Sequence, residues 1–286
     1  MRTCRRCFAL PTDRAVSSEG AAASCRGLVK IYWTATGEVH ALKGIDAEFP
    51  ARAVTAVVGP SGSGKSSLLR ILAGLDRATA GTFQVGEVNL SGLGPRHLRR
   101  IRRRLVGYVF QRPSDNLVSY LSVRQHVRLA ARLRGRARHR SADDLLRALS
   151  IDHRGDHLPH QLSGGEQQRV AFAQAVIGSP GLVVADEPTA ELDSHTAAEL
   201  LATVRSLADA GASFVLSTHD PQVVEMADRT LHLRHGALEA ESTERRTLSV
   251  IDEAGRIQLP PKALEMFRDR RAVIEVEDGE VRISPP

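Results

Sequence analysis

The segment that most constrains this chain is residues 59–67, which read GPSGSGKSS and fill every fixed position of the phosphate-loop pattern G-x-x-x-x-G-K-[ST]. An apolar run at 53–58 predicts a buried strand before it, and residues 68–73 predict a helix after it that ends at Gly74. Because glycine permits a tight turn, backbone N–H groups and the positive end of the helix would face inward and hold a polyphosphate. The segment therefore predicts an α/β fold with a nucleotide site at this loop.

Two side chains of the loop have separate tasks in this motif. Lys65 would reach the β- and γ-phosphates, and the hydroxyl of Ser66 would ligate Mg²⁺. A glycine-rich turn without a ligand is the alternative, but it does not explain why strand, lysine and helix occur together. We expect the loop to bind ATP through Gly59, Pro60, Ser61, Gly62, Ser63, Gly64, Lys65, Ser66 and Ser67.

A second chemical feature is the apolar strand predicted at 182–185, which ends in Asp186 and Glu187. Asp186 would hold Mg²⁺, directly or through water, and Glu187 could polarise an attacking water. The alternative is that the two carboxylates cap the next helix. Residues 162–169, LSGGEQQR, add a Ser-Gly-Gly turn at the start of a helix, which makes a second nest of backbone N–H groups for an anion. That nest could close on a γ-phosphate bound by a partner subunit.

Composition limits the ligands and the cellular location that this chain can have. The formal net charge of +6 suits ATP, an anionic membrane face or nucleic acid, and does not choose among them. No apolar run approaches the ~18 residues that a membrane helix needs, and no apolar core follows the N-terminal arginines. We therefore expect a cytoplasmic chain. Cys4 and Cys7 have the spacing of half a zinc site, but no second Cys or His pair lies nearby, which favours a cysteine pair in a loose tail.

The chain divides into segments of different character. Arginines crowd residues 96–104 and 121–150, where they could face nucleic acid or lipid headgroups or form a solvated helix face. Short antiparallel strands are expected at 28–31 and 44–49. The expected organisation is a disordered tail at 1–24, a nucleotide-binding domain at 25–240 with a helical subdomain at about 112–160, a linker at 241–247, and a β-rich module at 248–286.

Across roughly residues 26–240 the chain resembles the nucleotide-binding subunit of an ABC transporter. The resemblance rests on the phosphate loop, VVADEP at 183–188 and LSGGEQQR at 162–169. It implies a P-loop NTPase fold with an antiparallel β subdomain and a helical subdomain. It also implies two copies that close over two ATP molecules, each phosphate loop facing the partner's Ser163 and Gly165.

The same resemblance assigns further residues. Tyr32 would stack on adenine, and His219 would contact the γ-phosphate beside Lys65 and the base Glu187. Gln111 would touch both Mg²⁺ and the coupling surface, and Asp193 would lie at the dimer contact. Hydrolysis of ATP is the implied reaction.

Residues 32–46, with GYVFQ at 107–111 and ADEPT at 185–189, resemble the macrolide-exporter, lipoprotein-release and cell-division branch of that family. This branch implies a separate integral membrane permease, with the ATPase peripheral on the inner face of the cell membrane. It also implies export or mechanical transmission, and Val39 would help to seat the adenine.

The C-terminal module resembles the AbrB-like swapped hairpin. Residues 248–264 predict two strands around a turn and then a short helix after Pro260 and Pro261, and 271–276 and 280–283 predict a hairpin around Asp278 and Gly279. About 40 residues seldom build a stable core alone, so pairing with a second copy is expected. Its acidic residues outnumber its basic ones, which disfavours nucleic acid. A regulatory ATPase that binds DNA through this module is the alternative function, and a soluble ABC protein acting on ribosomes or DNA ends is a third.

Overall fold

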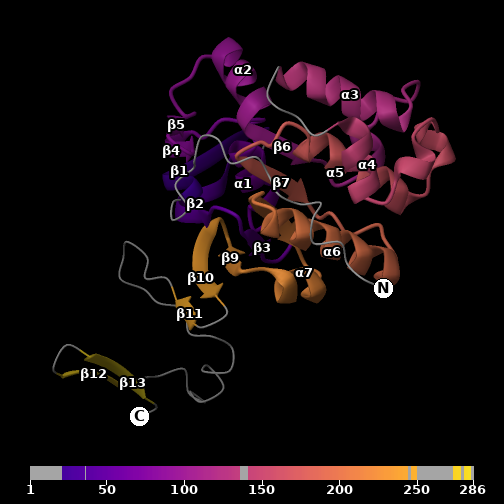
Figure 1. Cartoon of the computed structure of the whole chain (residues 1–286). Helices are drawn as coiled ribbons and strands as arrows, with labels where there is room; N and C mark the ends of the chain where they lie inside the picture. The colour runs from indigo at the N-terminus through magenta and orange to yellow at the C-terminus, as the bar shows by residue number, and fades with distance from the viewer. Residues whose placement is uncertain are drawn as a thin grey trace.

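The computed structural model describes residues 21–35, 37–135, 141–243, 246–249, 273–277 and 280–284. Its centre is a seven-stranded sheet in the order β11-β10-β9-β3-β8-β7-β6 (Figure 1). Neighbouring strands run parallel from β9 through β3, β8 and β7 to β6. The bounds of the parallel strands are β3 Val54–Val58, β6 Val106–Val109, β7 Leu182–Asp186, β8 Phe214–Thr218 and β9 Arg229–Arg234.

The parallel strands are apolar because both of their faces are covered. Along β7, Val183 and Ala185 join one core cluster, whereas Leu182 and Val184 join the other. Successive side chains of a strand point to opposite faces, so a continuous apolar run is what a doubly covered strand requires. The first cluster lies under the helices α3 Val123–Arg134, α4 Ala142–Ala148, α5 Gly164–Val176, α6 Ser194–Asp209 and α7 Pro221–Met226. The second lies under α1 Lys65–Leu72, α2 Pro95–Leu105 and the antiparallel sheet.

The antiparallel sheet has the order β2-β1-β4-β5, in which β4 (Ala80–Val85) and β5 (Val88–Asn89) form a hairpin. Two boundaries differ from the predictions. β1 (Ala21–Thr34) and β2 (Gly37–Pro50) each span 14 residues, far longer than the strands expected from composition. Residues 21–24, assigned to the tail, therefore belong to the sheet. Their small side chains resemble a low-complexity segment, but Ala22 and Ala23 are buried because β1 pairs with both β2 and β4.

The helical region follows β6 and contains α3 and α4, in agreement with the helical subdomain expected at about 112–160. It contains the short 3-10 turns η1 (Pro113–Asn116), η2 (Asp152–Arg154) and η3 (Pro159–Gln161). Ser122 and Gln125 form a capping box at the start of α3. Of the arginines singled out there, Arg136, Arg138 and Arg140 lie outside the described residues.

The expected linker at 241–247 is wrong, because its described residues lie in strands. β10 (Ala237–Thr243) pairs with β9 and with β11 (Arg246–Ser249) and extends the central sheet at its edge. β11 is the edge strand of the sheet and β10 lies next to it, and polar, charged sequence is typical of strands at the edge of a sheet. Farther along, β12 (Val273–Glu277) and β13 (Glu280–Ser284) confirm the predicted hairpin. The expectations for 1–20, with Cys4 and Cys7, and for 250–272 lie outside the described residues.

No helix in the described ranges is both long enough and apolar enough to cross a bilayer.

Candidate active site

The phosphate loop joins β3 to α1, as predicted, and it requires glycine for two different structural reasons. Gly59, Gly62 and Gly64 all adopt positive φ, at 154°, 77° and 104°. A Cβ on Gly59 would lie 2.0 Å from the carbonyl oxygen of Leu233, and one on Gly64 would lie 2.4 Å from that of Ala41. The loop therefore needs glycine both for its curvature and because two other segments press against its backbone.

Lys65 is the first residue of α1, and its ammonium lies against the loop. Nζ donates to the carbonyl oxygens of Gly59 at 2.7 Å and Pro60 at 3.2 Å. Nearby, the hydroxyl of Ser63 is buried and has no hydrogen-bond partner among the described residues. A tight backbone turn, a positioned cation and an unused polar atom are the features that a polyphosphate would use, so the residues present fit ATP.

Hard oxygen donors gather where α1 begins beside the end of β7. The Oγ of Ser66 lies 3.4 Å from Oδ1 of Asp186, whose residue is 8% exposed. Ser217, at the end of β8, donates a short hydrogen bond to the same carboxylate oxygen. Hydroxyl and carboxylate oxygens are the ligands that Mg²⁺ prefers, and it usually takes only one or two from the protein. Ser66 and Asp186 therefore fit the predicted metal site.

Gln111 reaches the same edge of the sheet by a different route. It follows β6, in which Val109 pairs with Ala185 next to Asp186. Gln111 itself is exposed, and no hydrogen bond in the described part of the chain joins it to Ser66 or Asp186. The structure thus places Gln111 at the same edge of the sheet but does not bring it into contact with Ser66 or Asp186.

Glu187 is held in an uncommon backbone conformation at the tip of β7. Its φ is 46°, a left-handed value that costs a non-glycine residue about 1 kcal/mol or more. Its backbone N–H donates to the Oγ of Ser217 at 2.9 Å, and its carboxylate lies 2.8 Å from Nδ1 of His219. Parallel pairing of Asp186 with Ser217 brings the two strand ends together. Such strain at a carboxylate beside a histidine is typical of a catalytic position.

Ser217 is the residue that the sequence analysis missed. It is fully buried and links the carboxylate of Asp186 to the backbone of Glu187, because its hydroxyl donates to the first and accepts from the second. Its position two residues before His219, at the end of a predicted strand, was the available signal. A serine in an apolar strand looks like ordinary sheet sequence until the neighbouring strand is known.

Tyr32 and Val39, the predicted adenine contacts, are cross-strand partners of β1 and β2. The hydroxyl of Tyr32 donates to Oδ2 of Asp76 at 2.9 Å, and Nζ of Lys30 lies 4.6 Å from the centroid of its ring. Lys30 also pairs with Asp76 at 2.7 Å. Partial burial opposes ionisation of Asp76, but the hydrogen bonds from Lys30, the Arg77 backbone and Tyr32 hold the pKa of this carboxyl below its usual value. One face of the Tyr32 ring is therefore covered by a cation.

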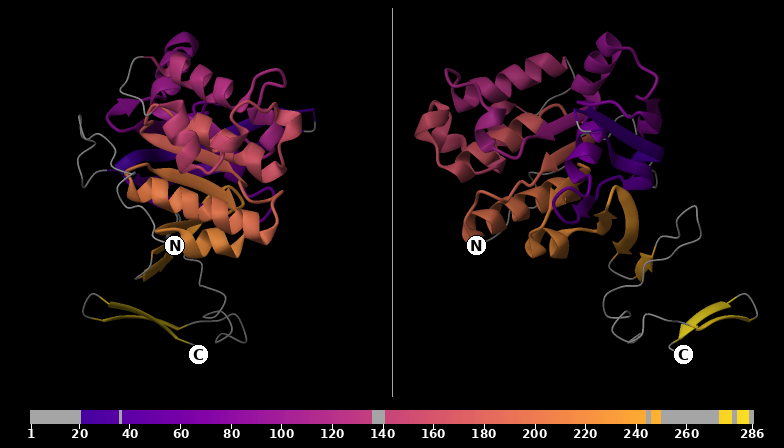
Figure 2. Two further views of the ribbon diagram at one scale, coloured as in Figure 1. Left: turned by 45° about the vertical axis from the view of Figure 1, so that its right-hand side comes forward. Right: turned by 180° about the vertical axis from the view of Figure 1, so that it is seen from behind.

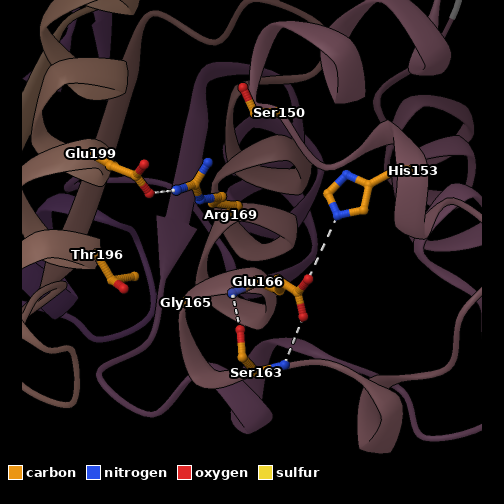
Figure 3. A pocket seen from close by; sticks show the side chains of 8 residues that line it. All are labelled: Ser150, His153, Ser163, Gly165, Glu166, Arg169, Thr196 and Glu199. Atoms are coloured by element: carbon orange, nitrogen blue, oxygen red, sulfur yellow. Dashed lines mark hydrogen bonds and ion pairs between the residues drawn. The ribbon is translucent and has the colours of Figure 1, made fainter.

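The second anion nest lies at the start of α5. Ser163 and Glu166 form a capping box, with Ser163 Oγ accepting from the Glu166 N–H at 3.2 Å and Glu166 Oε2 accepting from the Ser163 N–H at 2.8 Å. Figure 3 shows these residues in a polar pocket between α5 and α6. The pocket is lined by Ser150, His153, Ser163, Gly165, Glu166, Arg169, Thr196 and Glu199.

Asp193 caps α6 directly beside this nest. Its carboxylate accepts from the backbone N–H groups of His195 at 3.1 Å and Thr196 at 3.0 Å, and from Thr196 Oγ1 at 2.6 Å. Those hydrogen bonds, led by the one from the Thr196 side chain, lower the pKa of Asp193. Thr196 in turn packs against Gly165, where a Cβ would meet its Cγ2 at 2.2 Å. No hydrogen bond in the described ranges joins this cluster to the phosphate loop.

A phosphate loop before α1, acids at the end of the neighbouring strand and a second anion nest at α5 define an ATP-binding cassette on a P-loop fold. A family model described as ABC transporter matches residues 42–190, which is more than half of the chain. The chain belongs to the ABC transporter family, and it is an ATPase of that family.

Individual relatives agree with this family. The Macrolide export ATP-binding/permease protein MacB of Escherichia coli strain K12 is 40% identical over 204 residues, covering 70% of this chain. The protein of the same name from Shigella flexneri gives the same identity and coverage. The chain spans only 31% of the length of these relatives.

Solved structures of similar fold include two of the cassette MJ0796. The structure described as a dimeric post-hydrolysis state bound to ADP and Pi matches with a TM-score of 0.71 and 30% identity, over 78% of this chain and 99% of that one. A second dimeric MJ0796 structure matches with the same TM-score and 31% identity, over the same shares of both chains.

Proposed function

We propose that this chain is the ATP-hydrolysing subunit of a transporter whose membrane permease is a separate protein, and that two copies act together. The observation that carries the proposal is the set of Asp186, Glu187, Ser217 and His219 at the ends of β7 and β8, beside the helix that begins at Lys65. Export or mechanical transmission is the favoured role, because the similar MacB proteins are named for macrolide export.

In the proposed reaction the chain positions ATP and a water molecule. Lys65 holds the β- and γ-phosphates, with the N–H groups of residues 59–67 around them. Glu187 accepts the proton of the attacking water, and His219, whose Nδ1 lies 2.8 Å from the Glu187 carboxylate, orients that carboxylate and faces the γ-phosphate. Ser66, Asp186 and Gln111 would hold Mg²⁺, which neutralises charge on the phosphates when bound.

The second copy supplies the remaining anion site. Ser163 is exposed at the N-terminus of α5, where free N–H groups and the helix dipole favour a phosphate. Gly165 keeps α5 close to α6, because it packs against Thr196, which in turn bonds to Asp193. We propose that each ATP lies between the phosphate loop of one copy and Ser163 and Gly165 of the other. The dimeric cassette MJ0796 supports this arrangement.

Replacement of Glu187 by glutamine tests the assignment of the base. The variant keeps the shape of the side chain but removes the proton acceptor, so we expect ATP binding to persist while turnover falls by roughly 10² or more. Glu191→Gln is the matched control, because Glu191 is an exposed acid that makes no described contact with the site. Near-normal hydrolysis by the Glu187 variant would exclude Glu187 as the base. ATP binding that persists in Lys65→Ala would exclude the phosphate loop as the ATP-binding site.

The C-terminal module was expected to begin at 248, but Leu248 and Ser249 lie in β11 of the central sheet, so the residues after β11, 250–286, are proposed to strengthen pairing between copies rather than to bind DNA. The described hairpin of β12 and β13 is too small to bury a core alone. Deletion from residue 250 onward should weaken self-association in the absence of ATP and leave the ATP affinity unchanged. A salt-sensitive shift of random duplex DNA by the full chain, lost on this deletion, would instead favour the DNA-binding alternative.

A further inference from the structure

The helix α2 (Pro95–Leu105) has six arginines among its 11 residues and no acidic residue. It is held in place by apolar residues at helical spacing, because Leu98 is buried and both Ile101 and Leu105 pack against the same core. The side chains on its other faces point outward. The exposed arginines are Arg96, Arg99, Arg100, Arg103 and Arg104.

The charges of these five arginines are not balanced by carboxylates among the described residues. In the part of the chain that the structure describes, none of the five forms an ion pair, and the one described hydrogen bond from their side chains joins Arg99 Nε to the Pro95 carbonyl at 3.4 Å. Elsewhere arginines are paired with carboxylates, as in Arg124–Asp143, Arg154–Glu166, Arg169–Glu199, Arg205–Asp228 and Arg229–Glu241.

Repulsion between neighbouring arginines is part of the structure of α2. Residues three and four apart on a helix are neighbours, so Arg99 faces Arg103 and Arg100 faces Arg104 across one turn. Burial, together with the charges of Arg103 and Arg99, lowers the pKa of Arg102. A surface that carries negative charge would relieve this repulsion, and the helix offers no internal partner that would do so.

A second helix adds apolar surface next to this charge. The α2 and α3 helices are in contact and lie together at one end of the molecule (Figures 1 and 2). Their C-terminal ends meet, because Nη1 of Arg134 at the end of α3 donates to the carbonyl oxygen of Arg103 at 3.4 Å. Leu129 and Leu133, one turn apart on α3, are 40% and 52% exposed.

Exposed leucines beside a dense row of arginines match the chemistry of a bilayer interface. Arginines bind lipid phosphates, while leucines enter the boundary between headgroups and acyl chains. A nucleic-acid surface would also need the arginines, but for a single strand it would place stacking aromatic side chains, rather than leucines, next to them. The combination therefore favours anionic phospholipid over nucleic acid.

We propose that α2 and the exposed leucines of α3 form a docking face for anionic phospholipid, which holds the cassette against the membrane without help from the permease. This inference extends the proposed function, since it concerns how the same ATPase reaches the membrane. The face lies outside the nucleotide site, so ATP hydrolysis does not depend on it.

The test measures binding of the full chain to phosphatidylcholine vesicles with and without phosphatidylglycerol. We expect binding only to the vesicles that contain phosphatidylglycerol, and weaker binding as salt rises. Each basic side chain near an anionic surface raises the partition coefficient roughly fivefold, so R99Q/R103Q should weaken binding about 25-fold. The doubly changed chain should keep its rate of ATP hydrolysis, which shows that it is folded.

The matched control is K43Q/R52Q, which removes the same charge from exposed positions on β2 and in the turn after it. It should bind the anionic vesicles like the unchanged chain, apart from the small effect of net charge. Failure of the unchanged chain to bind these vesicles would overturn the proposal, and so would equal losses in the two variants. Tighter binding to random duplex DNA than to the vesicles would assign the face to nucleic acid. None of these outcomes bears on ATP hydrolysis, which is measured separately.

Discussion

The contact between Gly165 and Thr196 leads to a quantitative prediction for Gly165→Ala. A methyl group at Gly165 would lie 2.2 Å from Cγ2 of Thr196, so that side chain would have to move by more than 1 Å. It cannot rotate freely, because its Oγ1 is bonded to Asp193 at 2.6 Å. Overpacking of this kind costs about 1–3 kcal/mol, and replacing glycine by alanine in a helix returns about 1 kcal/mol. We expect a net loss of about 1 kcal/mol in the free energy of unfolding.

A second substitution separates this clash from other effects. Thr196→Ser removes Cγ2 but keeps the hydroxyl that bonds to Asp193, and alone it should lose about 1 kcal/mol for the missing methyl group. In Gly165→Ala/Thr196→Ser the clash is absent, so the double variant should be close to the unchanged chain. Gly164→Ala is the control, because a Cβ at Gly164 meets nothing within 4 Å.

The assay is denaturant unfolding without nucleotide, so that the role proposed for Gly165 in ATP binding does not affect the measured free energy of unfolding. The double-mutant cycle should give a coupling of about 1 kcal/mol or more between the two positions. If the two losses simply add to within about 0.5 kcal/mol, or if Gly164→Ala is as destabilising as Gly165→Ala, the contact is not the reason for glycine at this position.

Other predictions concern buried polar groups away from the nucleotide. His126 is buried, and its Nε2 accepts from the backbone N–H of Val118 at 2.8 Å. Because burial lowers the pKa of His126 in the folded state, lowering the pH from 7 to 5 should protonate this histidine first in the unfolded chain and so reduce the free energy of unfolding. The reduction should be smaller in His126→Gln. Arg134→Met should lose about 2–3 kcal/mol of unfolding free energy, since it leaves carbonyl oxygens at the end of α5 without a donor. Burial raises the pKa of the Cys25 thiol to about 12, so the Cys4→Ser/Cys7→Ser variant should react with a thiol reagent only when unfolded.

Features made by consecutive residues could be predicted from the sequence. The phosphate loop with α1, and the Ser-Gly-Gly turn with its Glu166 cap on α5, each lie within one short stretch, and both are present in the structure. The apolar strand that ends in Asp186 and Glu187 is also local, because the doubly covered strand of a parallel sheet must be apolar along its whole length.

Several groups that surround the site could not be predicted in this way. Ser217 is 31 positions from Asp186, yet the parallel pairing of β7 with β8 brings the two together. Tyr32, which was predicted to stack on adenine, also donates a hydrogen bond from its hydroxyl to Asp76, 44 residues later in the chain. Each of these residues looks ordinary beside its own neighbours in the sequence.

By itself, the order of residues determined where a phosphate can be held and which elements surround it, because a tight turn and a helix start depend on the dihedral preferences and hydrogen-bonding groups of adjacent residues. Only the tertiary structure decided the lengths of β1 and β2, the inclusion of 241–243 in the strand β10 of the central sheet, and the close fit of Gly165 to Thr196. Those features depend on which distant segments pack together. Burial and close contact are properties of the packed chain that the local pattern of apolar and polar residues does not contain.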